Sequence, residues 1–87
     1  MRYRVEIDVT RYWHNRTVWY LNGRKNRQDG PAATISNGNK YYYLNDHYHR
    51  EDGPALIILT KTDFYDVGEK YYLFNRLYSK QDFYNIP

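Results

Sequence analysis

The chain has 87 residues, of which 41% are hydrophobic and 20% aromatic, with 12 Tyr and no Cys. A chain of this length forms one small domain with a thin core, and the lack of cysteine excludes disulfides and thiolate metal sites as supports. The net charge is +3, but residues 1–27 carry seven basic and two acidic residues, against six and eight in the remainder. This asymmetry allows an acidic partner at the N-terminal part.

The first predicted element is a strand over Arg2–Thr10. Its apolar residues alternate with charged or polar ones, which is the pattern of a strand with one buried face. The apolar set is Tyr3, Val5, Ile7 and Val9. We expect this strand to lie at a sheet edge that only its charges protect, so a homodimer through edge pairing is a second route to function.

A repeated unit with the pattern Y-L-N-x-x-x-x-R-x-D-G-P-A follows. The first copy begins at Tyr20, the second begins 23 residues later at Tyr43, and a degenerate third begins at Leu73. The third copy loses Gly-Pro-Ala, as expected for a terminal unit with no following neighbour. An insertion over 61–68 precedes it and predicts a longer loop.

Each unit predicts β-hairpins. Aromatic runs at Tyr41–Leu44 and Lys70–Phe74 favour strands, and turns are expected at Asn22-Gly23, Asn45-Asp46 and Asn75-Arg76. Asp-Gly-Pro then breaks the chain, because proline lacks a ladder donor and glycine permits an unusual backbone angle. New strands follow at Ala32–Ser36 and Ala55–Thr60, the first of which turns back at Asn37-Gly38. No segment reaches helix length with a 3.6-residue period.

The expected fold is therefore all-β, an antiparallel meander of repeated β-hairpins in one small sheet. The chain reads as a single domain over 1–87, with an N-terminal strand and irregular segment at 1–17 and repeat units at 18–39, 40–69 and 70–87. The longest apolar run, Ala55–Leu59, predicts a buried strand and is too short to cross a membrane. With no signal-peptide pattern at the N-terminus, we expect a soluble, cytoplasmic protein.

The unit resembles a variant of the MORN repeat, "YxNGxxHRxDGPA", known from small bacterial, bacteriophage and giant-virus proteins. The resemblance covers roughly Val18–Asp82 and is clearest at Trp19–Gly23 and His49–Ala55; Asn26 stands where the variant has His, and Asp46 where it has Gly. It implies an elongated sheet of stacked hairpins and a role in protein–protein interaction, scaffolding or lipid contact. It implies no catalytic residue. By this analogy we expect a phage or bacterial accessory factor that inhibits or neutralises a larger protein, in the host cytoplasm if it is phage-encoded.

The most conspicuous string, a basic residue before Asp-Gly-Pro, is interpreted as scaffold. It recurs, whereas an active site is needed once. We expect each Asp to accept backbone N–H bonds in its turn and to pair with the basic residue. The predicted structural turn residues are Asn22, Gly23, Asp29, Gly30, Pro31, Asp52, Gly53 and Pro54.

No catalytic, cofactor-binding or metal-binding residue is predicted. His47 and His49 would share a strand face, but nothing supplies convincing third and fourth ligands. Ser36 and Ser79 lie in no nucleophile motif, and no Gly-rich loop precedes a helix.

Function is expected in the segments that depart from the repeat, since additions there leave the scaffold intact. We therefore predict a non-enzymatic protein-binding module that presents aromatic and basic side chains to a protein partner. The predicted partner-binding residues are Arg11, Tyr12, Trp13, Arg16, Trp19, Phe64 and Tyr65. The alternative is an RNA- or single-stranded-DNA-binding protein that uses the basic, aromatic N-terminal surface.

Overall fold

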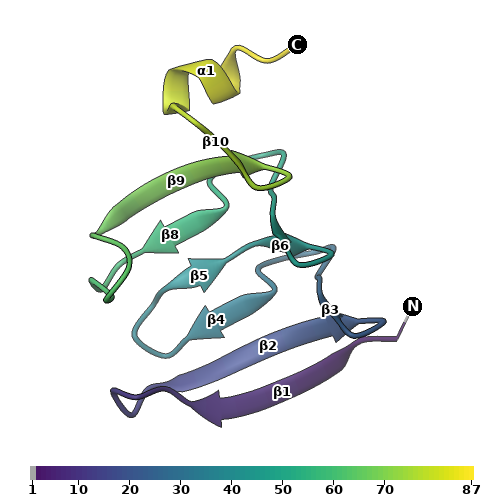
Figure 1. Cartoon of the computed structure of the whole chain (residues 1–87), viewed down its shortest axis with the longest axis vertical. Coiled ribbons are helices and arrows are strands. Elements are labelled where there is room, and N and C mark those ends of the chain that lie inside the picture. Colours follow the sequence, from purple (N-terminus) through teal and green to yellow (C-terminus); the bar gives the residue numbers. More distant parts are fainter. Residues whose placement is uncertain (1) are drawn as a thin grey trace.

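An eight-stranded antiparallel sheet forms most of the molecule in the computed structural model, which describes residues 2–87. Its order is β1-β2-β4-β5-β8-β9-β10 with β3 beside β2, while β6 and β7 form a separate hairpin (Figure 1). The strands are β1 (Arg4–Val9), β2 (Asn15–Leu21), β3 (Arg24–Lys25), β4 (Ala33–Ile35), β5 (Lys40–Tyr41), β6 (Tyr43–Leu44), β7 (His47–Tyr48), β8 (Leu56–Ile58), β9 (Gly68–Leu73) and β10 (Arg76–Tyr78). This confirms the prediction of an all-β, antiparallel fold.

Three tight turns close the hairpins. Asn22 and Gly23 have φ of 53° and 77°, and Asn45 and Asp46 have 49° and 68°, as a type I′ turn requires. The third turn does not lie at Asn75-Arg76, so that prediction is wrong. It consists of Phe74 and Asn75, with φ of 47° and 67°, because Leu73 pairs with Arg76. Asn75 therefore corresponds in position to Asp46 and not to Asn45, one residue away from the alignment that matches the asparagines.

Neighbouring hairpins are joined through the second residue of the turn. Asp46 Oδ1 accepts from the N–H of Lys25 at 2.8 Å, and the N–H of Asp46 donates to the Lys25 carbonyl at 2.9 Å. Asn75 makes the same pair of bonds to Tyr48, at 2.6 and 2.9 Å. These contacts explain why glycine at this position occurs only in the first unit, at Gly23: the later units need a side chain that reaches back.

The Arg-x-Asp-Gly-Pro loops hold their arginines flat against aromatic rings. The guanidinium of Arg27 lies 3.9 Å from the Trp19 ring centroid, and that of Arg50 lies 4.0 Å from Tyr42. Their Nη1 atoms donate to the carbonyls of Pro31 and Pro54, at 3.4 and 3.2 Å.

Two details of the loop prediction were wrong. Gly30 and Gly53 are not in the left-handed region. Instead, a Cβ at these positions would lie 3.4 and 3.0 Å from the arginine Cζ, so glycine makes room for the guanidinium. Asp52 pairs with Arg50 at 3.0 Å, but no ion pair joins Arg27 to Asp29 within residues 2–87. The turns depend mainly on arginine stacking rather than on the aspartates.

The core is thin, as expected for this length. Ala55, Leu56 and Ile58 form its centre and are at most 1% exposed, and five half-buried tyrosines pack against them. These are Tyr41, Tyr42, Tyr48, Tyr65 and Tyr72. The tyrosines extend the apolar interior, and the hydroxyls of Tyr65 and Tyr48 lie 3.5 Å apart and bond to each other.

The N-terminal strand departs from the expectation of a half-buried face. All six residues of β1 are exposed, including Val5, Ile7 and Val9. The strand lies at the sheet edge as predicted, but no second layer formed by residues 2–87 covers its apolar side. Periodicity showed which side chains share a face and could not show whether anything packs on that face.

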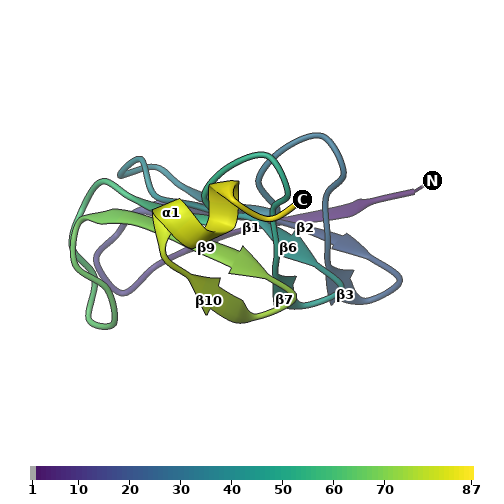
Figure 2. The same ribbon diagram turned by 90° about the horizontal axis from the view of Figure 1, so that it is seen from above.

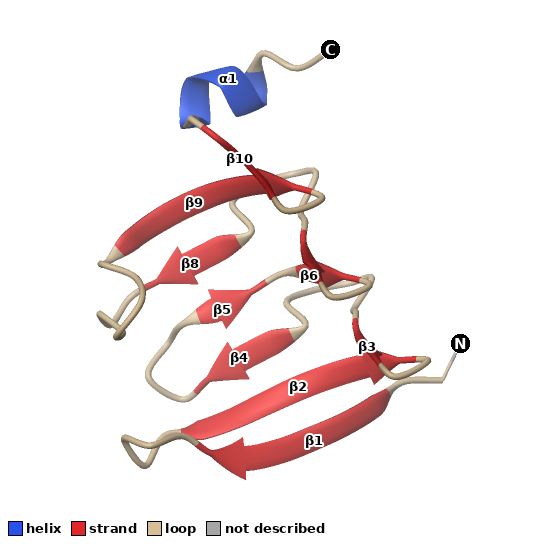
Figure 3. Cartoon of the chain, viewed as in Figure 1, coloured by secondary structure: helices blue, strands red, loops and turns tan. Residues whose placement is uncertain are grey.

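A short C-terminal helix was not predicted. Helix α1 (Lys80–Tyr84) begins after Ser79, whose Oγ accepts from the N–H of Asp82 at 3.1 Å (Figure 3). Its Phe83 is buried, with its ring centroid 5.0 Å from that of Tyr71. In the first two units an arginine covers the equivalent ring, so α1 takes over that role in the third. Five residues are too few for a periodic signal, and in residues 2–87 no helix is long and apolar enough to span a bilayer.

Candidate functional site: two joined loops and a tyrosine-lined groove

The loop between β1 and β2 holds an exposed tryptophan in an unusual backbone conformation. The N–H of Trp13 donates to the Thr10 carbonyl at 2.9 Å, and the N–H of Thr10 donates to the His14 carbonyl at 2.8 Å. This is a three-residue hairpin loop whose last residue must be left-handed, a position that usually holds glycine. Trp13 occupies it with φ of 65° and is 87% exposed.

Asp63 joins this loop to the long loop between β8 and β9. Its Oδ2 lies 3.0 Å from Arg11 Nη1, and its Oδ1 accepts from the Tyr12 hydroxyl at 2.9 Å. The hydrogen bond to the carboxylate raises the pKa of Tyr12 above its ordinary value. Two segments about fifty residues apart in sequence thus share one set of contacts, at the same end of the sheet (Figure 1).

Two polar residues hold the long loop in place. Asn39 is fully buried, and its Oδ1 accepts from the N–H groups of Leu59 and Thr60 at 2.8 and 2.9 Å. Thr62 Oγ1 accepts from the N–H groups of Phe64 and Tyr65, at 3.1 and 2.8 Å. Phe64 remains 88% exposed at the tip. No local sequence signal marks Asn39, because its partners come from a distant loop.

A groove of about 500 Å³ opens beneath the joined loops. It is lined by Thr10, Tyr12, His14, Arg16, Ile35, Asn37, Tyr41, Tyr48, Thr60, Lys61, Thr62, Asp63, Phe64 and Tyr65. In the view along the sheet, strands β3, β7 and β10 bend toward one face of the main sheet (Figure 2).

Two tyrosines of the groove, Tyr41 and Tyr48, are neutral hydrogen-bonding groups. Burial, together with hydrogen bonds to Tyr43 and Tyr65, raises the pKa of Tyr48 far above its ordinary value. Burial likewise raises the pKa of Tyr41. At neutral pH these hydroxyls therefore donate and accept hydrogen bonds and do not act as bases. This lining suits recognition of a ligand that has both apolar and polar groups.

The structure brings together most of the predicted partner-binding residues. Tyr12, Arg16, Phe64 and Tyr65 line the groove, and Arg11 contacts Asp63 at its rim. Trp13 lies in the adjoining loop. Trp19 does not belong to this set: it alternates with Arg16 and Val18 along β2, so it faces the other side of the sheet, beneath Arg27.

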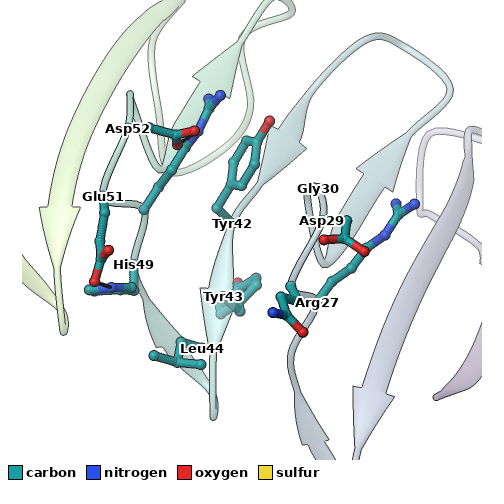
Figure 4. Close-up of a pocket in the computed structure, with 11 residues that line it drawn as sticks. Arg27, Asp29, Gly30, Tyr42, Tyr43, Leu44, His49, Glu51 and Asp52 are labelled. Carbon is teal, nitrogen blue, oxygen red and sulfur yellow. Dashed lines mark hydrogen bonds and ion pairs between the residues drawn. The ribbon is translucent and has the colours of Figure 1, made fainter. Parts of the chain in front are cut away.

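A second cavity, of about 640 Å³, lies between the two Asp-Gly-Pro loops. Figure 4 shows Tyr42 and Tyr43 between the two turns, with Arg27 on one side and His49 on the other. Both turns contribute the same arginine stack to its walls. Because repetition of the scaffold creates this cavity, we assign the candidate site to the groove beneath the loops.

The two neighbouring histidines are engaged in turn contacts. His49 Nδ1 accepts from the N–H of Phe74 at 3.1 Å, and its ring lies 4.1 Å from the Phe74 ring. His47 Nδ1 lies 2.7 Å from Asn75 Nδ2. Across residues 2–87, no three His, Asp or Glu side chains gather in an arrangement suited to a metal ion.

Comparison with known proteins adds no relative. No protein-family model matches the chain, and neither the curated proteins nor the solved structures contain a match.

Proposed function

We propose that this protein is a non-enzymatic protein-binding module whose binding surface is formed by the two joined loops and the groove beneath them. The proposal rests mainly on the contacts of Asp63, which accepts hydrogen bonds from both Arg11 and Tyr12 and so joins the two loops. A single partner can then contact side chains from both.

The exposed aromatic residues support this proposal. Trp13 and Phe64 are 87% and 88% exposed, although each could bury a large apolar area. Tryptophan and tyrosine are enriched among the residues that dominate binding energy, and a preformed loop loses little entropy when it binds. The left-handed backbone of Trp13 supports it further, because strained residues persist most often at functional sites.

The charge arrangement weighs against the nucleic-acid alternative. Three arginines of the basic N-terminal part are paired with carboxylates: Arg4 with Glu6, Arg11 with Asp63, and Arg16 with Asp8. Phosphate binding needs cations that can exchange counterions for phosphates, and paired arginines supply less of this. A protein partner with an apolar or aromatic protrusion suits the groove better. Inhibition of a larger protein is the particular form of the proposal that the repeat resemblance suggests.

The proposal can be tested with three matched variants. The purified protein is used to capture partners, and any captured protein is then purified and titrated against the wild type, Trp13→Ala, Phe64→Ala and Leu77→Ala. We expect a stoichiometric complex that weakens at least about tenfold in the first two variants, as loss of an interface anchor does. Leu77 is also an exposed apolar residue, 57% exposed, but lies on β10 and serves as the control. Equal binding by all four proteins would refute the proposed surface, and salt-sensitive binding of RNA or DNA instead would favour the alternative.

A further inference from the structure

The free edge of β1 lacks the protection found at the other end of the sheet. Among the strands of residues 2–87, β1 pairs only with β2, whereas the chain beyond β9 continues into β10 and α1, which pack beside it. β1 contains no proline, lysine or glycine, and all six of its residues are exposed. Its protection is limited to the charges of Arg4, Glu6 and Asp8, whereas natural edge strands also use lysine, proline, a bulge or a cover, because an open edge can pair with another strand.

The register shows which backbone groups this edge offers. Thr10 donates to the carbonyl of His14, so the even-numbered residues of β1 direct their backbone groups toward β2. Val5, Ile7 and Val9 therefore direct their N–H and C=O groups outward. The same alternation holds across β2, where Trp19 bonds away from β1, to Ala32.

The side chains of these three residues form an exposed apolar row. Val5, Ile7 and Val9 are 44%, 70% and 55% exposed and lie on one face of the strand, opposite Arg4, Glu6 and Asp8. A strand that pairs with this edge would satisfy the outward backbone groups and would place its own side chains beside the row.

We propose that β1 pairs antiparallel with β1 of a second copy of this chain, with the twofold axis at Glu6. In this register Arg4 of each copy faces Asp8 of the other, and Val5 faces Ile7. Moving the axis to Ile7 would keep the apolar contacts but would place Glu6 opposite Asp8 twice. Charge complementarity therefore favours the axis at Glu6 over the axis at Ile7, because one Glu–Glu contact is offset by two Arg–Asp contacts. An axis at Val5 would place Arg4 opposite Glu6 but would pair only residues 4–6 of β1.

This dimer has a geometric consequence for the candidate site. The twofold axis makes the two β1 strands antiparallel, so the joined loops of the two copies lie at opposite ends of one continuous sheet. The dimer would present two identical binding surfaces at opposite ends of the sheet, with both grooves on the same face. The dimer does not depend on the proposed function, and the proposed function does not depend on the dimer.

Analytical ultracentrifugation of the full chain over a wide concentration range tests the proposal. We expect a reversible monomer–dimer equilibrium with no larger species, because pairing uses up the open edge. Ile7→Pro should abolish the dimer and leave the melting temperature nearly unchanged, since the N–H that it removes points outward. Ile7→Lys provides a second variant should the proline disturb folding, and Leu77→Lys, on β10, should leave the dimer intact. A wild type that stays monomeric at all concentrations, or a dimer that survives in folded Ile7→Lys, would overturn the pairing.

Engineered cysteines test the position of the axis, and the chain has no native cysteine to interfere. Glu6 would face its own copy at a pair without backbone hydrogen bonds, where Cβ atoms come closest. Glu6→Cys should therefore form an intermolecular disulfide under mild oxidation, much faster than Ile7→Cys. Faster cross-linking of Ile7→Cys would overturn the proposed register.

Discussion

Replacing Trp13 with glycine should stabilise this protein while it weakens partner binding. A left-handed backbone costs a non-glycine residue about 1–2 kcal/mol, whereas glycine loses about 0.5–1 kcal/mol of extra chain entropy on folding. Trp13 is 87% exposed with φ of 65°, so its removal sacrifices little packing. The expected net gain is about 0.5–1 kcal/mol, which corresponds to a rise of roughly 2–8 °C in the melting temperature of a domain this small.

Trp13→Ala separates the side chain from the backbone effect. Alanine keeps the Cβ and hence the strained conformation, so its stability should stay within about 0.5 kcal/mol of the wild type. Both variants should lose partner binding, but only glycine should gain stability. Thermal unfolding followed by circular dichroism measures the first quantity, and titration with a captured partner measures the second. If Trp13→Gly melts no higher than Trp13→Ala, the strain at this loop contributes nothing and the reasoning is wrong.

Three further predictions concern the scaffold and its ion pairs. Asn39→Ala should lower the free energy of unfolding by about 1–3 kcal/mol, because it leaves the N–H groups of Leu59 and Thr60 without their acceptor. Chemical denaturation measures this loss, and amide hydrogen exchange in the long loop should become faster. Gly53→Ala should destabilise by about 1 kcal/mol by displacing the guanidinium beside it, whereas Gly30→Ala, with more room, should be nearly neutral; equal effects would argue against close approach as the reason for glycine. The hydrogen bond from Arg16 holds the pKa of Asp8 below its ordinary 3.8, so this carboxylate stabilises the fold above that pH and the stabilisation is lost as the pH falls through the lowered pKa. Asp8→Asn should therefore make the free energy of unfolding depend less steeply on pH below about pH 3.8 and leave its pH dependence near pH 7 unchanged. Acid denaturation curves of the two proteins check this.

Local signals predicted the all-β fold because they report on short stretches of backbone. Asn22-Gly23 needs no distant partner to favour a type I′ turn, and proline after glycine ends a strand wherever it occurs. The recurrence of Arg-x-Asp-Gly-Pro likewise indicated a scaffold before its geometry was known. The same local reasoning failed at the third turn, where Phe74 takes a position that favours asparagine or glycine. There, pairing of β9 with β10 and the bonds from Asn75 to Tyr48 decide the register.

The sequence by itself determined the segments of β1, β4, β5, β6, β8 and β9 and the first two turns. It did not show the extent of β2, which begins at Asn15 inside the segment expected to be irregular. Only the tertiary structure decided how those segments are arranged, because their contacts join residues far apart along the chain. Asp63 bonds to Arg11 and Tyr12, which lie more than half the sequence away. Trp19 lies outside the site because side chains alternate between the two faces along β2. The exposed side of β1 was equally beyond sequence reasoning, since periodicity shows that apolar residues share a face and never shows what covers it.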